Sequence, residues 1–261
     1  MPGKVSVVIL GAGFGGVSCA IETAKRRSSA DEMSITVIDR ERHHLFTPLL
    51  YEAATGFFAH ENLASIRSLE KGCTADAVEI LRPWEVAFMQ DTVEGIDWEK
   101  REVAMRNGPR VRFDYLVVAF GAETSYFGIP GLKEHAINFK TIHDADRVRQ
   151  RVQDLLSKRE AGKEKKVTIM VGGAGASGVE LAGEMTLFLR RLMMAGKLQP
   201  EDFQVSIVEA RSRVLPAFDK DVSAWAAERL ADLGVKIYAD TCVKQLDRGR
   251  VTLIPRPLAK G

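Results

Sequence analysis

The residues best suited to chemistry in this chain are glycines whose spacing is typical of turns that hold a phosphate. Two groups of three share one spacing: Gly11, Gly13 and Gly16, and then Gly173, Gly175 and Gly178. In such a turn the first glycine allows a tight bend, the second lets the backbone approach a pyrophosphate, and the third lets a helix pack closely on a strand. The helix N-terminus that follows favours an anion through its free N–H groups and its dipole. The glycines therefore predict two dinucleotide sites.

The segments around each group are those that such a site needs. An apolar strand at 5–10 precedes the first turn, a helix at 17–25 follows it, and a strand at 35–39 ends in Asp39. An acid roughly 20 residues past the last glycine can accept a hydrogen bond from a ribose hydroxyl. The second copy has a strand at 167–171, a helix at 179–194 and a strand at 204–209 that ends in Glu209. This context favours dinucleotide binding over the alternative, a glycine turn without a ligand.

Two copies of the unit imply two dinucleotides, and an enzyme that holds two most economically passes electrons between them. Glu209 favours NADH because it would repel the 2′-phosphate of NADPH, whereas Arg211 and Arg213 nearby could accommodate that phosphate. Glu180 and Glu184 lie on one face of the second helix. Glu180 would orient a nicotinamide or relay a proton, or else only stabilise the helix dipole. Glu184 is most simply a solvated surface acid.

The composition limits the classes of function. The chain has 261 residues, a net charge of +2 and 46% hydrophobic residues, which suits one large domain or two ordinary ones and gives no electrostatic footprint for nucleic acid. Three cysteines without a CxxC pair argue against a disulfide framework, a zinc site and a redox dithiol, and they favour a cytoplasmic location. His43 and His44 lack a third ligand at metal-site spacing, so no metal is expected. The uncharged stretch 5–21 is too short and too rich in glycine to span a membrane.

The remaining segments complete a prediction of fold. Pro48 disfavours helical geometry at Thr47, so the apolar stretch 43–51 should begin as an extended segment or loop that covers either core or a flat ligand ring. Short strands at 86–89, 92–97, 102–105 and 110–113 would form a small antiparallel sheet, and 115–119 a buried strand of the parallel sheet. Further helices are expected at 61–69, 141–159 and 219–233, and strands at 235–238 and 251–254. The predicted fold class is α/β, with two Rossmann-like dinucleotide-binding domains, 1–160 and 161–261, and a small antiparallel sheet insertion.

Together these motifs resemble the type II NADH dehydrogenases, single-subunit flavoproteins with two dinucleotide-binding domains. The resemblance extends over essentially the whole chain and rests on the stretches 11–16 with Asp39, 44–51, 54–56, 115–122, 127–131 and 172–184. The Phe-Thr-Pro-Leu-Leu segment at 46–50 is the most discriminating, because the wider class of flavoproteins shares the rest.

The resemblance implies that FAD binds the first unit and NADH the second. Hydride would pass from NADH to the flavin, and electrons then to a membrane quinone without proton pumping. The FAD residues implied are Gly11, Gly13, Phe14, Gly15, Gly16, Asp39, Arg40, Thr47, Val93, Ala119, Gly121 and Ala122. The NADH residues implied are Gly173, Gly175, Ser177, Gly178 and Glu209, with Glu180 as the catalytic residue beside the stacked rings. The family also implies peripheral contact with the cytoplasmic face of a membrane and a homodimer.

Two departures from the family pattern alter these expectations. Phe120 stands where the family commonly has a small or hydroxyl residue, so a flavin contact there would use backbone groups. The chain also stops at Gly261, before the family's return segment, quinone-site segment and membrane-docking helices. Three alternatives follow: an NADH dehydrogenase or the N-terminal portion of one, a nucleotide-binding fragment without quinone turnover, and a flavoprotein reductase with another acceptor.

Overall fold

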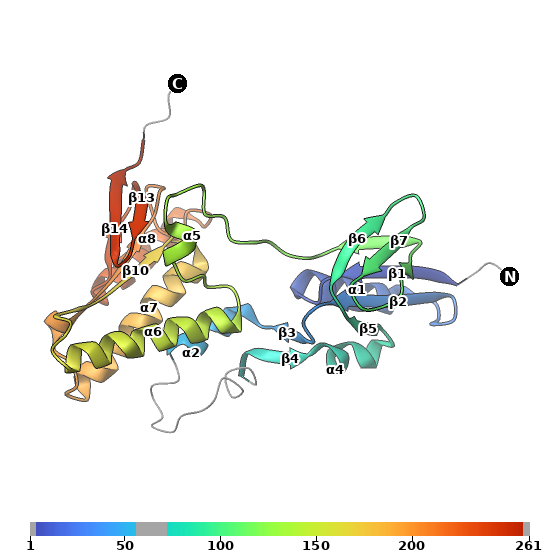
Figure 1. Ribbon diagram of the computed structural model, residues 1–261, viewed down its shortest axis with the longest axis horizontal. Helices are drawn as coiled ribbons and strands as arrows, with labels where there is room; N and C mark the ends of the chain where they lie inside the picture. The colour runs from blue at the N-terminus through green and yellow to red at the C-terminus, as the bar shows by residue number, and fades with distance from the viewer. Residues whose placement is uncertain (1–3, 56–71, 258–261) are drawn as a thin grey trace. The chain divides into compact units, whose positions relative to one another are not determined.

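The computed structural model describes residues 4–55 and 72–257 and divides into two compact units (Figure 1). Unit 1 comprises Met1–Phe46 and Cys73–Glu123, and unit 2 comprises Thr47–Gly72 and Thr124–Gly261. Each unit contains one of the glycine turns. The domain division at residue 160 remains a prediction, and the helix predicted at 61–69 lies outside the described residues.

Unit 1 is built on a parallel sheet with the strand order β5-β2-β1-β9. These strands are β5 (Ala87–Gln90), β2 (Met33–Asp39), β1 (Val5–Leu10) and β9 (Tyr115–Val118). Helix α1 (Phe14–Arg26) connects β1 to β2, and α4 (Ala77–Leu81) with the 3₁₀ turn η3 (Arg82–Trp84) leads into β5. A small antiparallel sheet of β6 (Val93–Asp97), β7 (Glu102–Met105) and β8 (Val111–Arg112) adjoins the parallel one.

Strand β1 is apolar at every position except Ser6, and both faces of the sheet are covered along Val7–Leu10. Val7 and Ile9 pack in one core cluster with α1 and α4, while Val8 and Leu10 pack in another with β7 and Phe113. Figure 1 accordingly places α4 and the pair β6 and β7 on opposite sides of the parallel strands. An unbroken apolar run is the expected pattern for a strand buried on two faces.

Two strand predictions in unit 1 are wrong. The segment predicted at 86–89 was assigned to the antiparallel sheet, but β5 pairs in parallel with β2 and belongs to the main sheet. The segment predicted at 115–119 is parallel as expected, yet β9 is an edge strand with Tyr115 66% and Val118 54% exposed. Both errors arise because a short apolar run carries no information about which neighbour a strand pairs with.

The stretch 43–55 is more regular than the sequence suggests. It begins extended, as predicted, because β3 (His43–Leu45) pairs antiparallel with β4 (Thr74–Asp76). The inference from Pro48 is wrong, since Thr47–Leu49 forms a 3₁₀ turn that continues into helix α2 (Leu50–Thr55). Pro48 is tolerated because it stands in the first turn, where its missing N–H has no intrahelical partner to lose.

Unit 2 contains the second parallel sheet, with the order β10-β11-β12. Its strands are β10 (Val167–Gly172), β11 (Phe203–Val208) and β12 (Lys236–Tyr238), and its crossover helices are α7 (Ala176–Met194) and α8 (Lys220–Asp232). The hairpin of β13 (Thr241–Asp247) and β14 (Arg250–Pro255) follows, and β13 was not predicted. The short helix α5 (Leu132–His135) and the 3₁₀ turn η4 (Pro200–Asp202) complete the unit. The α/β fold class with two parallel sheets and an antiparallel insertion is confirmed.

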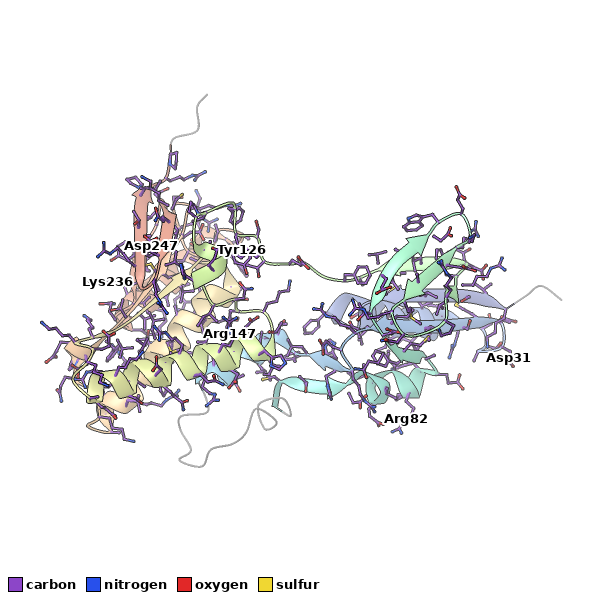
Figure 2. The ribbon with its side chains drawn as sticks, viewed as in Figure 1. Asp31, Arg82, Tyr126, Arg147, Lys236 and Asp247 are labelled. Carbon is purple, nitrogen blue, oxygen red and sulfur yellow. The ribbon has the colours of Figure 1, made fainter. Side chains whose placement is uncertain are left out.

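Helix α6 (Ile142–Glu160) lies within one residue of its predicted bounds. Thr141 caps it through a capping box with Asp144, whereas Asp146 is buried and pairs with Arg149 at 2.5 Å. At the other end Arg159 pairs with Asp202, which also accepts a hydrogen bond from the Gln199 N–H. Many charged side chains instead lie on the surface, among them Asp31, Arg82, Arg147, Lys236 and Asp247, which Figure 2 labels.

No helix in the described part of the chain combines the length and the apolar character needed to span a bilayer.

Candidate functional site

The first glycine turn is close-packed on one side and open on the other. A Cβ at Gly11 would lie 2.3 Å from the Ala119 carbonyl oxygen, and one at Gly16 would lie 1.8 Å from the Gly11 carbonyl oxygen. Gly11 also has φ +109°, a conformation that side chains rarely allow. At Gly13 and Gly15 a Cβ would meet nothing within 4 Å. Gly11 and Gly16 are therefore required for close packing, and Gly13 and Gly15 leave room for a ligand.

Asp39 is bonded directly to this turn. Its Oδ2 accepts a 2.6 Å hydrogen bond from the Ala12 N–H, and its Oδ1 accepts one of 2.9 Å from the Glu41 N–H. The neighbouring Arg40 side chain is 73% exposed. Each carboxylate oxygen still has a lone pair for a further donor such as a hydroxyl.

An aromatic cluster that the sequence did not predict borders the turn. His44 Nδ1 lies 2.9 Å from the Ala12 carbonyl oxygen. The Phe14 ring meets His44 edge-on at 4.8 Å between centroids and Phe46 at 5.5 Å. The only sequence signal was the apolar run after His43, which favoured a covering segment without saying what it covers.

The other residues assigned to FAD are spread over several elements. Ala119 follows β9, and its N–H donates to the Leu10 carbonyl at 2.8 Å. Gly121 and Ala122 are exposed, as is Phe120 at 58%. Val93 lies on β6 and packs against a core cluster. Thr47 belongs to unit 2.

The second turn has the same arrangement. A Cβ at Gly178 would lie 2.0 Å from the Gly173 carbonyl oxygen, and Gly173 has φ +96°. Gly175 is the N-cap of α7 without a side-chain cap, just as Gly13 is for α1, and Ser177 in the first turn is exposed. Both helices thus offer backbone N–H groups at their N-termini, which suit the oxygen atoms of a diphosphate.

Glu209 repeats the contacts of Asp39. Its Oε2 accepts a 2.8 Å bond from the Ala174 N–H, and its Oε1 accepts one of 2.9 Å from the Arg211 N–H. The Arg213 guanidinium donates to the carbonyls of Pro216, at 3.1 Å, and Asp219. Arg213 is therefore engaged within its own loop, which removes one of the two arginines that could have received a 2′-phosphate.

Glu180 and Glu184 line a hollow of about 220 Å³ in unit 2, together with Tyr51 from α2 and Trp225 and Arg229 from α8. Glu180 is exposed and Glu184 is half-buried. Burial, followed by the charges of Glu52, Glu184 and Glu180, raises the pKa of the Tyr51 phenol. The Tyr51 phenol therefore stays protonated, and so uncharged, at neutral pH.

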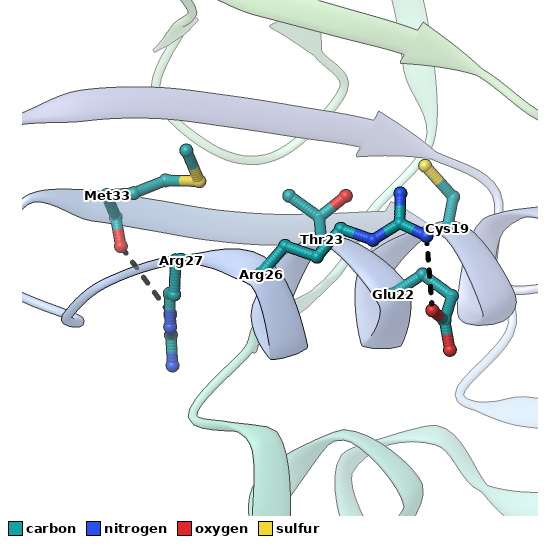
Figure 3. A pocket seen from close by; sticks show the side chains of 6 residues that line it. All are labelled: Cys19, Glu22, Thr23, Arg26, Arg27 and Met33. Carbon is teal, nitrogen blue, oxygen red and sulfur yellow. Dashed lines mark hydrogen bonds and ion pairs between the residues drawn. The ribbon is translucent and has the colours of Figure 1, made fainter.

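A hollow of about 320 Å³ in unit 1 lies along α1 and is lined by Cys19, Glu22, Thr23, Arg26, Arg27 and Met33 (Figure 3). The Arg27 side chain, 7% exposed, donates to the backbone carbonyls of Trp84, at 2.7 Å, and Met33. This hollow lies at the C-terminal half of α1, where the helix dipole repels anions, so it does not suit a phosphate.

Comparison with known proteins agrees with this geometry. The chain matches the pyridine nucleotide-disulphide oxidoreductase family over residues 5–255. It is 32% identical to the mitochondrial external alternative NADH-ubiquinone oxidoreductase of Yarrowia lipolytica, over 94% of this chain and 43% of that protein. It is 31% identical to the type II NADH:quinone oxidoreductase of Staphylococcus haemolyticus, over 91% of this chain and 57% of that protein. These relatives confirm the resemblance to type II NADH dehydrogenases.

A solved structure, NDH2 from Plasmodium falciparum in complex with NADH, shares the fold, with a TM-score of 0.81 and 23% identity over 97% of this chain and 51% of that one. The chain thus spans about half the length of the proteins that it matches. Because the family match extends over nearly all of its residues, the chain belongs to the pyridine nucleotide-disulphide oxidoreductase family.

Proposed function

We propose that this chain binds FAD at the first glycine turn and NADH at the second, and that it passes hydride from NADH to the flavin. The observation that carries the proposal is the pair of matching turns, each with an acid bonded to its backbone and an uncapped helix N-terminus. The names of the relatives include NADH, which favours NADH as one of the two dinucleotides.

At the first turn the residues fit the cofactor. The open side of Gly13 and Gly15 admits a diphosphate, which the N–H groups of α1 would bind, and Asp39 has lone pairs for a ribose hydroxyl. Bound flavin supplies a ring that accepts a hydride and releases its two electrons to a second acceptor. Phe14, Gly15, Arg40, Thr47, Val93 and the stretch 119–122 remain proposed FAD residues.

At the second turn the chemistry favours NADH over NADPH. Glu209 is fixed by two backbone N–H groups and would receive the ribose hydroxyl, while it would repel a 2′-phosphate. The Arg213 guanidinium already donates to backbone carbonyls, so of the two arginines only Arg211 would be available to bind a 2′-phosphate. Gly173, Gly175, Ser177 and Gly178 would bind the diphosphate.

Glu180 is the proposed catalytic residue, positioned in the second turn's own helix to orient the nicotinamide or hold a proton. Glu180→Gln should slow reduction of the flavin by NADH about tenfold while it changes the NADH Kd less. Stopped-flow measurement of the flavin half-reaction tests this role. Glu184→Gln serves as the control on the same helix face, and an unchanged half-reaction rate in Glu180→Gln would refute the role.

The electron acceptor proposed is a quinone, reached by peripheral contact with the cytoplasmic face of a membrane, without proton pumping and in a homodimer. The quinone is proposed from the names of the relatives, of which this chain spans about half the length. The membrane contact, the absence of proton pumping and the homodimer are proposed from the family resemblance alone. The alternatives are a fragment that binds nucleotides without quinone turnover and a reductase with another acceptor.

Spectroscopy of the purified chain tests the proposal. The protein should bind added FAD and show the visible flavin absorption band, which NADH should bleach without oxygen. Quinone and soluble protein acceptors, added in turn, should restore the band if they are substrates. A chain that binds NADH but never FAD would be a nucleotide-binding fragment, and restoration by a protein acceptor alone would favour the third alternative.

A further inference from the structure

Both backbone polar groups of Ala12, in the first turn, have hydrogen-bond partners. Its N–H donates to Asp39, and its carbonyl oxygen lies 2.9 Å from His44 Nδ1. A carbonyl can only accept a hydrogen bond, so Nδ1 carries the proton and donates it. In the second turn Ala174 occupies the equivalent place, and its carbonyl accepts a 2.7 Å bond from the Leu215 N–H. The same contact is thus made by a side chain in one turn and by the backbone in the other.

The imidazole of His44 is itself firmly placed. It lies on β3, opposite Ala75 on β4, and Arg42, next to β3, pairs with Asp76 of β4 at 2.8 Å. Phe14 packs edge-on against the ring at 80° between planes. His44 therefore joins the paired strands β3 and β4 to the glycine turn at a fixed point.

Fixing the Ala12 carbonyl also fixes the next N–H. In a trans peptide the carbonyl and the following N–H point in opposite directions, so the bond to His44 directs the Gly13 N–H away from strand β3. Among the described residues this N–H donates to no other group, and Gly13 is the N-cap of α1. It is therefore a donor that remains for a ligand.

We propose that His44 is a positioning residue for the first turn, which holds the Ala12–Gly13 peptide in the orientation that receives the FAD diphosphate. The identity of the ligand, FAD, rests on the proposed function. The hydrogen bond from His44 to the Ala12 carbonyl, called the clamp below, does not depend on it. The donor to the turn carbonyl is thus a side chain at the proposed FAD site, and it is the backbone N–H of Leu215 at the proposed NADH site.

Three variants separate donation from packing. His44→Phe keeps an aromatic ring beside Phe14 but removes the donor, His44→Ala removes both, and His44→Asn keeps a donor nitrogen at about the distance of Nδ1 from the backbone. The first two should weaken FAD binding about tenfold, the loss expected for one hydrogen bond in a fixed site, and His44→Asn should restore most of it. The NADH Kd should not change in any variant.

Hydrogen exchange of the flavin-free chain provides a second readout. Amides of residues 11–16 should exchange faster in His44→Phe than in the wild type or His44→Asn, while residues 173–178 should not change. Wild-type exchange and wild-type FAD affinity in His44→Phe would overturn the inference. A wild-type chain that takes up no FAD would refute the proposed function instead, and the exchange of residues 11–16 would then decide whether the clamp exists.

Discussion

The two glycine turns have matching backbones, but they are secured by different donors. At Ala12 the carbonyl accepts from the His44 side chain, and at Ala174 it accepts from the Leu215 backbone. The acid contacts are the same in both, with Asp39 and Glu209 each accepting from the turn. A backbone donor is independent of the side chain at its position, whereas a side-chain donor can be lost by one substitution. The first turn thus depends on one more side chain than the second, His44 in addition to the acid.

The turns also differ in what surrounds their first glycine. Strand β1 lies inside its sheet, between β2 and β9, so the end of β9 brings the Ala119 carbonyl against Gly11. Strand β10 is an edge strand, and a Cβ at Gly173 would meet nothing within 4 Å. Strand order therefore decides why the first glycine is required. Gly11 is required both because a side chain would clash and because its φ is positive, and Gly173 only because its φ is positive.

The largest loss of stability should come from substituting the third glycine, and it should be similar in both turns. Gly16→Ala and Gly178→Ala each place a Cβ within 2.0 Å of a carbonyl oxygen of their own turn, so the helix must move off its strand. Each should lower the free energy of unfolding by about 3 kcal/mol or more. Urea denaturation of the purified variants measures this. Gly15→Ala and Gly183→Ala, in the same two helices with no Cβ contact, are the controls and should be neutral or stabilising.

The next effect should separate the two turns. Gly11→Ala and Gly173→Ala both incur the penalty of positive φ, about 1–2 kcal/mol. Only Gly11→Ala also meets the Ala119 carbonyl, at 2.3 Å, so it should be the more destabilising by at least about 1 kcal/mol. The same urea measurement applies. Equal losses in the two variants would contradict the account based on strand order.

Sequence reasoning predicted the parts of the site that depend on local backbone geometry. Gly11, Gly16 and Gly178 stand where a side chain cannot fit, and Gly173 has a positive φ that side chains rarely adopt. These requirements leave a regular spacing. The repeat of the whole unit around Gly173 then predicted a second parallel sheet.

Contacts between distant segments left no such pattern. His44 lies 32 residues after Ala12, and its place depends on the antiparallel pairing of β3 with β4. Strands of three residues leave too short a pattern for the sequence to predict that pairing. The engagement of Arg213 likewise depends on how its loop folds back to the Pro216 carbonyl. Propensity and periodicity describe neighbours in sequence, and these contacts are set by tertiary structure.

Substitution of the two acids should affect cofactor binding at one turn and leave the other unchanged. A glutamine at 209 can accept from only one of the two N–H groups that Glu209 now binds, and it carries no charge to repel a phosphate. Glu209→Gln should therefore raise the KM for NADH about tenfold with little change in kcat. It should also reduce the ratio of kcat/KM for NADH to that for NADPH. Asp39→Asn is the matched change in unit 1 and should weaken FAD binding alone. A fall in kcat at constant KM would show that Glu209 acts in the chemical step.

The smallest effect should be a difference in acid sensitivity between the units. In unit 1 the buried Arg27 guanidinium donates mainly to carbonyls, which do not titrate, whereas in unit 2 Arg159 pairs with the carboxylate of Asp202. The Arg159 guanidinium, followed by the Gln199 N–H, lowers the pKa of Asp202 below its ordinary 3.8. A carboxyl with a lowered pKa stabilises the fold above its ordinary pKa, and that contribution is lost as the pH falls through the lowered value.

Asp202→Asn should consequently lower the Tm by a few degrees at neutral pH, and the difference from wild type should shrink as the pH falls below about 4. Thermal unfolding between pH 3 and 7 provides the measurement. Asp154→Asn is the control, because Asp154 also has a lowered pKa but is 44% exposed in its pair with Lys158, where solvent screens the interaction. If the Asp202→Asn difference persisted at the acid end, the amide would be disturbing the packing at η4, and the charge of Asp202 would not be what stabilises unit 2.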